Sequence, residues 1–364
     1  MPRKTLILTI VIILVSAGAA GLLWYLVFGP LTAPAQPTGT TLPTELQGKI
    51  KQLSPTPTLW ASISSSQNKI FWYDESGQLW SSGLDGSGAK ATTQAPVQNF
   101  IKSAWSKDGS KNVMTLGTSQ KDIRFVSLFS ESAISTFLPN NTKTAAFSPD
   151  GKRIIYQVID DSKNQNTLFG SDPDGKKAAT VAVLRLRDVV VGWPQASLIS
   201  FVSKPSGLVG GSLWILNLKT LVFDKLIDNL NGLEVLWSPD GTKMLFSNTD
   251  QNAQNPRLSV MDLNGNAKDL GVSTAVGKCA WASNNRDVYC AAGHWPENAV
   301  LPDDYYKNAF SIVDDIGKIN VDSGKKDIII SSVVDAVNLV VSQNQDFLIF
   351  ITKNTGRLYR LGLK

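Results

Sequence analysis

The sequence has very little histidine and cysteine, with one histidine and two cysteines among its 364 residues. Zinc sites draw three or four ligands mainly from these two residue types, so the sequence predicts no metal site, and it shows no motif that calls for a cofactor. A Ser/His/Asp triad could use only His294, and no Gly-x-Ser-x-Gly elbow is present. These absences argue against a zinc enzyme and against a serine hydrolase.

Clusters of positive charge are also missing from the body of the chain. The formal net charge is +5, and residues 1–57 supply +3 of it through four basic residues and one acidic residue. The other 307 residues therefore carry only +2. Proteins that bind nucleic acids usually concentrate basic residues on one face, so the sequence predicts no nucleic-acid partner.

Charge is absent from one long N-terminal stretch, Leu6–Phe28. A helix over 6–28 would span ~34 Å at ~1.5 Å per residue, enough for the hydrocarbon core of a bilayer. Two basic residues precede the stretch and the next one is Lys49, a bias that places residues 1–5 in the cytoplasm. The sequence predicts a single-pass cell-membrane protein with an extracytoplasmic body. The alternative is a cleaved signal peptide, because residues 16–20 are small, but the apolar run is long for one.

The segment after the apolar stretch is rich in proline and threonine. Residues 29–44 cannot bury a core, and this composition predicts an extended linker. Residues 45–53 alternate between polar and apolar side chains and predict one strand. We therefore expect a Pro/Thr-rich linker followed by a folded body over residues 45–364.

A turn of five residues recurs along this body. Trp237-Ser238-Pro239-Asp240-Gly241 is the clearest copy, residues 147–151 repeat it with phenylalanine first, and residues 105–109 have lysine in place of proline. Proline fixes φ while aspartate and glycine accept tight-turn geometry, so each copy predicts a tight hairpin between two strands. The apolar residue before each turn marks one unit: Ile63, Trp105, Phe147, Trp193, Trp237, Trp281 and Val341.

The seven markers are spaced by 42, 42, 46, 44, 44 and 60 residues. A period in the forties, with room for four short strands, is typical of a β-propeller blade. The sequence therefore predicts an all-β fold, a seven-bladed β-propeller of four-stranded antiparallel blades. The last unit ends at Lys364 after its third strand, so we expect residues 45–53 to supply the missing outer strand and close the ring.

The Trp/Phe-Ser-Pro-Asp-Gly turn at this spacing resembles the WD40-like, PD40-type repeat of TolB-like periplasmic β-propeller proteins. The likeness covers residues 58–364 and is best at 143–160 and 233–263. The resemblance implies a propeller fold and an interaction role in the cell envelope, and it implies no catalytic residue. The transmembrane helix predicted over 6–28 departs from the soluble members of that family.

The connection inside the sixth unit is oversized, with about two dozen residues between a strand ending near Ala291 and one beginning near Lys318. Long loops on a rigid scaffold commonly carry binding residues, and exposed aromatic side chains are typical interface anchors. The alternative is a loop that packs its own aromatic residues over the blade. We predict binding by five residues of this connection: His294, Trp295, Asp303, Tyr305 and Tyr306.

The two cysteines, Cys279 and Cys290, belong to the two strands of the sixth hairpin. Their odd separation places both side chains on the same side of a tight hairpin. If the turn centres on Asn284 and Asn285, the cysteines face each other at disulfide distance; if it aligns with Ser-Pro-Asp-Gly, they are diagonal neighbours. A disulfide in an oxidising compartment and a pair of small buried side chains are both open.

Two functions fit these patterns. The first is a membrane-anchored extracytoplasmic module that holds the bilayer through residues 6–28 and binds a partner, a protein or an envelope polysaccharide, through its longer loops. The second is a glycan-active hydrolase or lyase working from the central funnel, which needs carboxylates such as Asp188 and Glu234 in one pocket. The predicted inner strands carry few acidic residues, which favours the binding module over the enzyme.

Overall fold

The computed structural model describes residues 49–64, 67–92, 95–117, 123–129 and 135–364. The segments predicted as a cytoplasmic end (1–5), a transmembrane helix (6–28) and a linker (29–44) lie outside the described residues. Among the residues that are described, no helix is long and apolar enough to cross a membrane.

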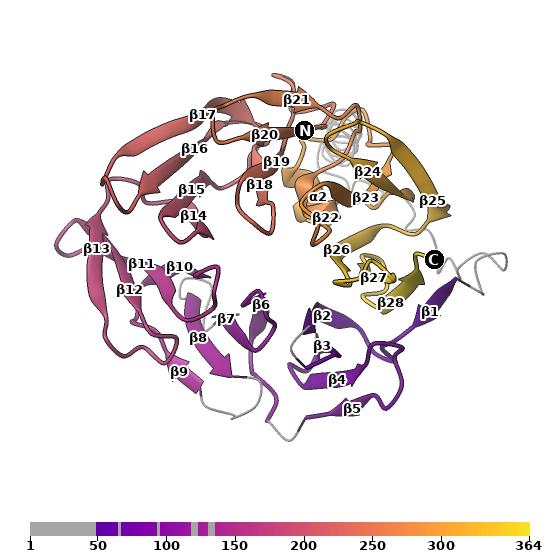
Figure 1. Ribbon diagram of the computed structural model, residues 1–364, viewed down its shortest axis with the longest axis horizontal. Helices are drawn as coiled ribbons and strands as arrows, with labels where there is room; N and C mark the ends of the chain where they lie inside the picture. Colours follow the sequence, from indigo (N-terminus) through magenta and orange to yellow (C-terminus); the bar gives the residue numbers. More distant parts are fainter. Residues whose placement is uncertain (1–48, 65–66, 93–94, 118–122, 130–134) are drawn as a thin grey trace, which may run out of the picture. The chain divides into compact units, whose positions relative to one another are not determined.

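The described residues form seven four-stranded antiparallel sheets around a common centre (Figure 1). This confirms the prediction of an all-β, seven-bladed propeller. In each blade the strands are named a to d from the innermost to the outermost. The strands of blades 1 to 4 are β2 Thr58–Ser64, β3 Lys69–Asp74, β4 Leu79–Gly83, β5 Lys90–Ala91; β6 Phe100–Trp105, β7 Lys111–Gly117, β8 Ile123–Phe129, β9 Ser135–Phe137; β10 Thr142–Phe147, β11 Ile154–Asp160, β12 Gln165–Ser171, β13 Ala179–Val183; and β14 Val189–Gln195, β15 Leu198–Ser203, β16 Gly210–Asn217, β17 Phe223–Asn231.

Blades 5 and 6 follow the same order, and blade 7 takes its outer strand from the other end of the chain. Two short helical segments, the 3₁₀ turn Val276–Lys278 and helix α2 Asp303–Tyr306, accompany blade 6. The strands are β18 Glu234–Trp237, β19 Lys243–Asn248, β20 Arg257–Asp262, β21 Ala267–Asp269; β22 Cys279–Trp281, β23 Asp287–Gly293, β24 Asp314–Asn320, β25 Lys326–Val333; and β26 Ala336–Val341, β27 Phe347–Thr352, β28 Leu358–Gly362, β1 Ile50–Gln52.

The repeated turn is held by side chains of the motif itself. The Ser238 hydroxyl donates to Asp240 Oδ1 (2.7 Å) and accepts from the Lys243 amide (3.1 Å). The backbone amide of Gly241 donates to the Ser238 carbonyl (2.9 Å), and its φ of +70° is one that glycine accepts without strain. In blade 6 Asn285 takes that position with a φ of +56°, which asparagine tolerates better than most residues. These local bonds explain why the motif recurs where strand a meets strand b.

Hydrophobic cores lie between neighbouring blades. Seven clusters of buried side chains each join two adjacent sheets, one for every interface around the ring. The marker residues Trp281 and Phe147 belong to two of these cores. Each sheet therefore buries apolar side chains on both of its faces.

The ring is closed by the N-terminal side of the described chain. β1 pairs antiparallel with β28, with Ile50, Lys51 and Gln52 opposite Leu361, Arg360 and Tyr359. The Ile50 side chain is buried in the core between blades 6 and 7. The pairing puts residues 50–52 in the outer position of blade 7, where the sequence left a strand missing.

The a–b turns approach one another at one end of the propeller, the a–b face. Lys107 in blade 2 donates across the ring to the Pro239 carbonyl in blade 5 (3.0 Å). Gln195 and Asn285, from blades 4 and 6, also bond the blade 5 turn, at 3.0 Å each. The opposite end carries the connections between strands b and c and is called the b–c face.

The closing register can be tested with a pair of cysteines. Gln52 and Tyr359 face each other across β1 and β28, whereas Lys51 points to the other side of the sheet. We expect Gln52→Cys/Tyr359→Cys to form a disulfide in full and Lys51→Cys/Tyr359→Cys to form little or none. Mass spectrometry of non-reduced peptides would measure both. Equal crosslinking in the two variants, or none in either, would contradict the register.

Candidate functional site

A long connection between β23 and β24 lies on the b–c face and is called the insertion, residues 294–313. Its helix α2 lies near the inner strands β18 and β22 (Figure 1). The insertion also reaches blade 4, because the amide of Gly207 donates to Asp303 Oδ2 (2.6 Å). In blade 5 the carbonyl of Ala253 accepts from the Leu301 amide (2.8 Å). The insertion is thus fastened to blades well beyond its own.

A buried group of charged side chains fixes the insertion to blades 6 and 7. Lys278 Nζ lies 2.9 Å from Asp314 Oδ2 and forms a second ion pair with Asp335. It also donates to the Tyr305 hydroxyl (3.0 Å), which in turn donates to Asp335 Oδ1 (2.6 Å). All four side chains are at most 2 % exposed. We call Lys278, Tyr305, Asp314 and Asp335 the buried cluster.

Each of the two carboxylates also accepts a hydrogen bond from one backbone amide. The Ala336 amide donates to Asp314 Oδ2 (2.7 Å), and the Ile312 amide donates to Asp335 Oδ2 (3.1 Å). Burial raises the pKa of Asp314 to about 6, while the nearby Lys278 ammonium opposes that rise. Burial and the two carboxylates also raise the pKa of Tyr305. The tyrosine therefore stays a neutral hydrogen-bond donor.

Lys353, which follows β27 in blade 7, also binds the insertion. Its Nζ donates to the carbonyls of Tyr305 (2.6 Å) and Phe310 (3.1 Å) and lies 3.4 Å from the centroid of the Tyr305 ring. Partial burial lowers its pKa to about 8. Lys353 thus adds a second positive charge beside the two buried aspartates.

Aromatic side chains form a small core inside the insertion. Trp295 and Phe310 both contact the buried Tyr305, with ring centroids 5.1 and 5.7 Å from it. Leu301 and Val337 pack against the same group. Trp295 also donates its indole N–H to the Ser273 carbonyl (3.2 Å). Two of the five predicted binding residues, Trp295 and Tyr305, therefore pack as the loop alternative expected.

The other three predicted residues have different surroundings. Asp303 is engaged with blade 4 through Gly207, while the His294 side chain is exposed. Tyr306 as a whole is 49 % exposed, but its hydroxyl donates to Glu234 in β18. Burial raises the pKa of Glu234, although the Tyr306 hydroxyl and the Gly277 amide donate to it and oppose the rise. Binding of a partner by these residues stays a prediction.

Sequence reasoning missed the residues that hold the site together. Lys278, Asp335 and Lys353 come from three separate segments, and none belongs to the repeated turn. One signal was present: Lys278 stands among apolar residues in Gly277–Trp281, which the sequence predicts as an inner strand and whose first two residues belong to the 3₁₀ turn. A lysine in such a place needs a buried partner. Its partners could not be named, because they are 36 and 57 residues away in the sequence.

A small pocket that is partly open to solvent lies between blade 5 and the insertion. Its walls include Glu234, Thr249 and Trp295. Asp188, the second acid of the enzyme hypothesis, is instead exposed and pairs with Lys204 (3.3 Å). The two carboxylates therefore do not line one pocket, which was the condition for the enzyme hypothesis.

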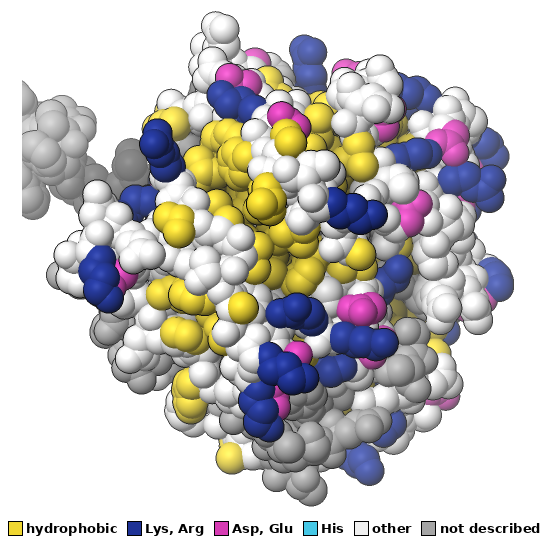
Figure 2. All heavy atoms as spheres, turned by 60° about the vertical axis from the view of Figure 1, so that its left-hand side comes forward, with side chains coloured by type: hydrophobic (Ala, Val, Ile, Leu, Met, Phe, Trp, Pro, Cys, Tyr) yellow, Lys and Arg dark blue, Asp and Glu magenta, His cyan; other side chains and the backbone are white. Residues whose placement is uncertain are grey.

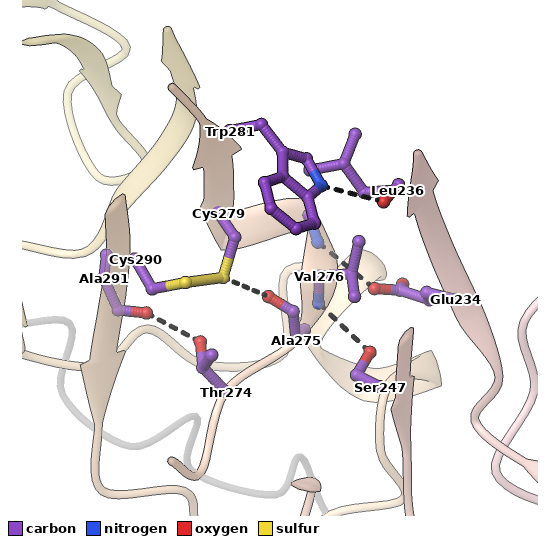
Figure 3. Close-up of a disulfide and its surroundings, with 11 residues drawn as sticks. Glu234, Leu236, Ser247, Thr274, Ala275, Val276, Cys279, Trp281, Cys290 and Ala291 are labelled. Atoms are coloured by element: carbon purple, nitrogen blue, oxygen red, sulfur yellow. Dashed lines mark hydrogen bonds between the residues drawn. A yellow bond between two sulfur atoms is a disulfide. The ribbon is translucent and has the colours of Figure 1, made fainter. Parts of the chain in front are cut away.

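The two cysteines form a disulfide between the inner strands of blade 6 (Figure 3). Cys279 and Cys290 are direct cross-strand partners with Cα atoms 4.1 Å apart. The turn of blade 6 centres on Asn284 and Asn285, and these residues occupy the places of Asp240 and Gly241 in blade 5. A turn centred on the two asparagines and a turn aligned with Ser-Pro-Asp-Gly are therefore the same register. Of the two alternatives, the face-to-face pair is confirmed and the diagonal one is wrong.

Hydrogen bonds tie the surroundings of this disulfide to blade 5 (Figure 3). The Val276 amide donates to the Ser247 hydroxyl (3.1 Å), and the Trp281 indole donates to the Leu236 carbonyl (3.0 Å). Cys279 directly follows Lys278 of the buried cluster. The disulfide thus braces β22, which begins directly after Lys278.

Hydrophobic side chains are also exposed on the outside of the ring. Figure 2 brings the side of blades 3 and 4 forward and shows hydrophobic groups gathered there, with Lys and Arg around them. Exposed large hydrophobic residues of these two blades include Val183, Leu221, Val222 and Phe223. Apolar surface of this kind is common where a protein meets another protein.

Comparisons with known proteins show the fold. No family model and no curated protein matches the sequence. Oligogalacturonate lyase in complex with manganese superposes with a TM-score of 0.63 at 11 % identity, over 86 % of this chain and 93 % of that one. The β-propeller domain of the Trilobed protease from Pyrococcus furiosus, described as having an open velcro topology, gives 0.57 at 12 % identity over 84 % and 96 %. TolB from Acinetobacter baumannii gives 0.46 at 11 % identity over 83 % and 78 %.

These likenesses extend to the propeller and no further, because all the identities are low. The lyase complex contains manganese, which raises the question of a metal site in the described part of this chain. No three His, Cys, Asp or Glu side chains come together there in a way that could hold a metal ion. The described residues therefore do not fit a bound manganese ion.

The buried cluster should dominate the stability of the insertion. Asp335→Asn removes one carboxylate and leaves Lys278 buried with a single counter-charge. We therefore expect the free energy of unfolding to fall by about 3–5 kcal/mol. Asp327→Asn is the matched control, since its ion pair with Lys325 is exposed, and it should change stability by less than about 1 kcal/mol. Urea unfolding measures both. Equal losses would show that the cluster contributes no more than a surface pair.

Proposed function

We propose that this protein is a membrane-anchored, extracytoplasmic β-propeller that binds a protein partner through its b–c face. The observation that carries the proposal is the fixation of the insertion. Contacts with blades 4, 5, 6 and 7 hold it in one place, yet His294 and Tyr306 still present exposed surface. A loop that is ordered before binding loses less conformational entropy on binding.

Exposed apolar residues on the same face support a protein as the partner. Leu208, in the b–c connection of blade 4, is 73 % exposed and follows Gly207, which bonds Asp303 of the insertion. Val313, at the end of the insertion, is 61 % exposed. Apolar groups surrounded by polar ones are typical of protein interfaces.

The location outside the membrane rests on the sequence and on the disulfide. Residues 6–28 have the length and composition of a membrane anchor, with basic residues only on the N-terminal side. The Cys279–Cys290 bond is of a kind that persists in oxidising compartments. Lys49 enters β1 from the a–b end, which is the end opposite to the b–c face.

A glycan lyase is the second candidate, because oligogalacturonate lyase shares the propeller over most of both chains. Two observations weigh against it: the described residues do not fit a manganese ion, and Asp188 lies outside the pocket that Glu234 lines. An enzyme of this class would raise the ultraviolet absorbance of an oligogalacturonate solution as unsaturated ends form. We expect no such rise with the full chain, with or without added manganese.

Binding through the b–c face can be tested by photo-crosslinking in cells. We expect a photoreactive residue at position 294 or 208 of the full chain to capture the same protein, and one at Lys152, exposed in the a–b turn of blade 3, to capture none. Val313→Asp should lower capture at position 294 by about tenfold or more, which equals about 1.4 kcal/mol. Its melting temperature should match the parent, because Val313 is exposed. Equal capture from positions 152 and 294 would contradict this use of the face.

The compartment can be tested through the thiols. We expect the full chain, alkylated in living cells before lysis, to yield Cys279 and Cys290 as a disulfide-linked peptide pair. A chain lacking residues 6–28 should stay in the reducing cytoplasm and yield both cysteines alkylated. Free thiols in the full chain would argue against an extracytoplasmic body.

A further inference from the structure

The inner strands of blades 1, 2 and 3 share an irregularity near their b–c end. The pairing of strands a and b shifts by one residue between Thr58 and Trp60, and at the corresponding places in blades 2 and 3. A bulge of this kind leaves one residue outside the ladder and redirects its side chain. The three residues left outside are Leu59, Ile101 and Lys143.

These bulged residues are exposed even though they lie on the innermost strands. Leu59 is 38 % exposed and Ile101 48 %, and Lys143 is exposed as well. In blade 4 Val190, near the start of β14, is 46 % exposed. Strands β2, β6, β10 and β14 surround one half of the centre of the ring (Figure 1). Leu59, Ile101, Lys143 and Val190 are together called the mouth arc.

The mouth of the propeller is the centre of the ring at its b–c face. The insertion covers the half of it that the mouth arc leaves. The residues near the start of the inner strands in blades 5, 6 and 7 each contact it. Glu234 accepts from Tyr306, Lys278 donates to Tyr305, and Val337 packs against the aromatic core of the insertion. The insertion therefore takes up blades 5–7 and leaves the mouth arc of blades 1–4 exposed.

At the a–b face, the opposite end of the propeller, hydrogen bonds join the a–b turns of different blades across the ring. Lys107 crosses from blade 2 to the Pro239 carbonyl in blade 5, and the turns of blades 4 and 6 bond the same turn. A partner would therefore reach the funnel from the b–c face, where the mouth arc adjoins the proposed binding surface.

The mouth arc has one charged member among three apolar ones. In the described part of the chain, Lys143 has no ion pair or hydrogen bond through its ammonium group. An unpaired ammonium among exposed apolar side chains is complementary to a carboxylate on an apolar surface. We propose that the mouth arc receives an apolar segment of the partner protein that carries a carboxylate, either an acidic side chain or the chain terminus. This inference rests on the proposed function, since it names the chemistry of the partner bound at the b–c face.

The test uses a photoreactive residue in place of Ile101 in the full chain, with the captured peptide sequenced by mass spectrometry. We expect the same protein that position 294 captures, attached through a segment with apolar residues and a carboxylate. Lys143→Glu should lower this capture at least tenfold and Lys143→Met severalfold, while Lys143→Arg should retain it. Lys152→Glu, an exposed reversal in the a–b turn of the same blade, is the matched control and should leave capture unchanged.

The outcomes separate this inference from the proposed function. Capture at 294 without capture at 101 overturns the role of the mouth arc and leaves binding at the b–c face intact. If capture at 101 is unchanged by Lys143→Glu, or if the captured segment is rich in lysine and arginine, the proposal that the bound segment carries a carboxylate is overturned. Absence of capture at both positions overturns the proposed function together with this inference. Matched melting temperatures of the Lys143 variants exclude unfolding as the cause of a loss.

Discussion

Every blade of this propeller buries apolar side chains on both faces, so no blade is complete until the ring is closed. Leu53, directly after β1, shares one core with Trp72 of blade 1 and Ile349 of blade 7. Without the pairing of β1 and β28, the edge of β28 and part of this core would meet water. The closing contact joins residues about 300 positions apart, so the last blade depends on the beginning of the described chain. Closure also fixes the positions of the inner strands and of the blades that hold the insertion.

The insertion adds a second constraint, because it is held by charges inside the protein. Burying Lys278 alone would cost several kcal/mol, and the pairing with Asp314 and Asp335 offsets that cost. An apolar core of equal volume could be as stable, but it would not direct the backbone in the same way. Here each carboxylate also accepts from one backbone amide, at Ile312 and at Ala336. These directional bonds determine which blades the insertion covers and, therefore, which part of the funnel mouth is left open.

The sequence predicted the parts of this structure that depend on neighbouring residues. Ser238, Asp240 and Gly241 close their turn by bonds within the motif, so the motif alone located the blades. The buried cluster could not be predicted in this way, because its members meet only after the ring has formed. The cysteine pair lies between these cases: the hairpin was predicted, but its register was taken as two alternatives that are one. Of the predicted binding residues, the exposed His294 and the half-exposed Tyr306 are still available to a partner, and Trp295 and Tyr305 are packed in the insertion.

The buried carboxylates beside the insertion are already engaged in ion pairs and hydrogen bonds. Catalysis on a glycan needs carboxylates that converge on a substrate and are free to gain or lose a proton. Asp314 and Asp335 are instead bonded to Lys278 and to backbone amides, and Glu234 is bonded to Tyr306 and Gly277. The same contacts that would hinder proton transfer make the b–c face rigid. A rigid face with exposed apolar groups is suited to recognising another surface, which is why we propose a binding role rather than a chemical one.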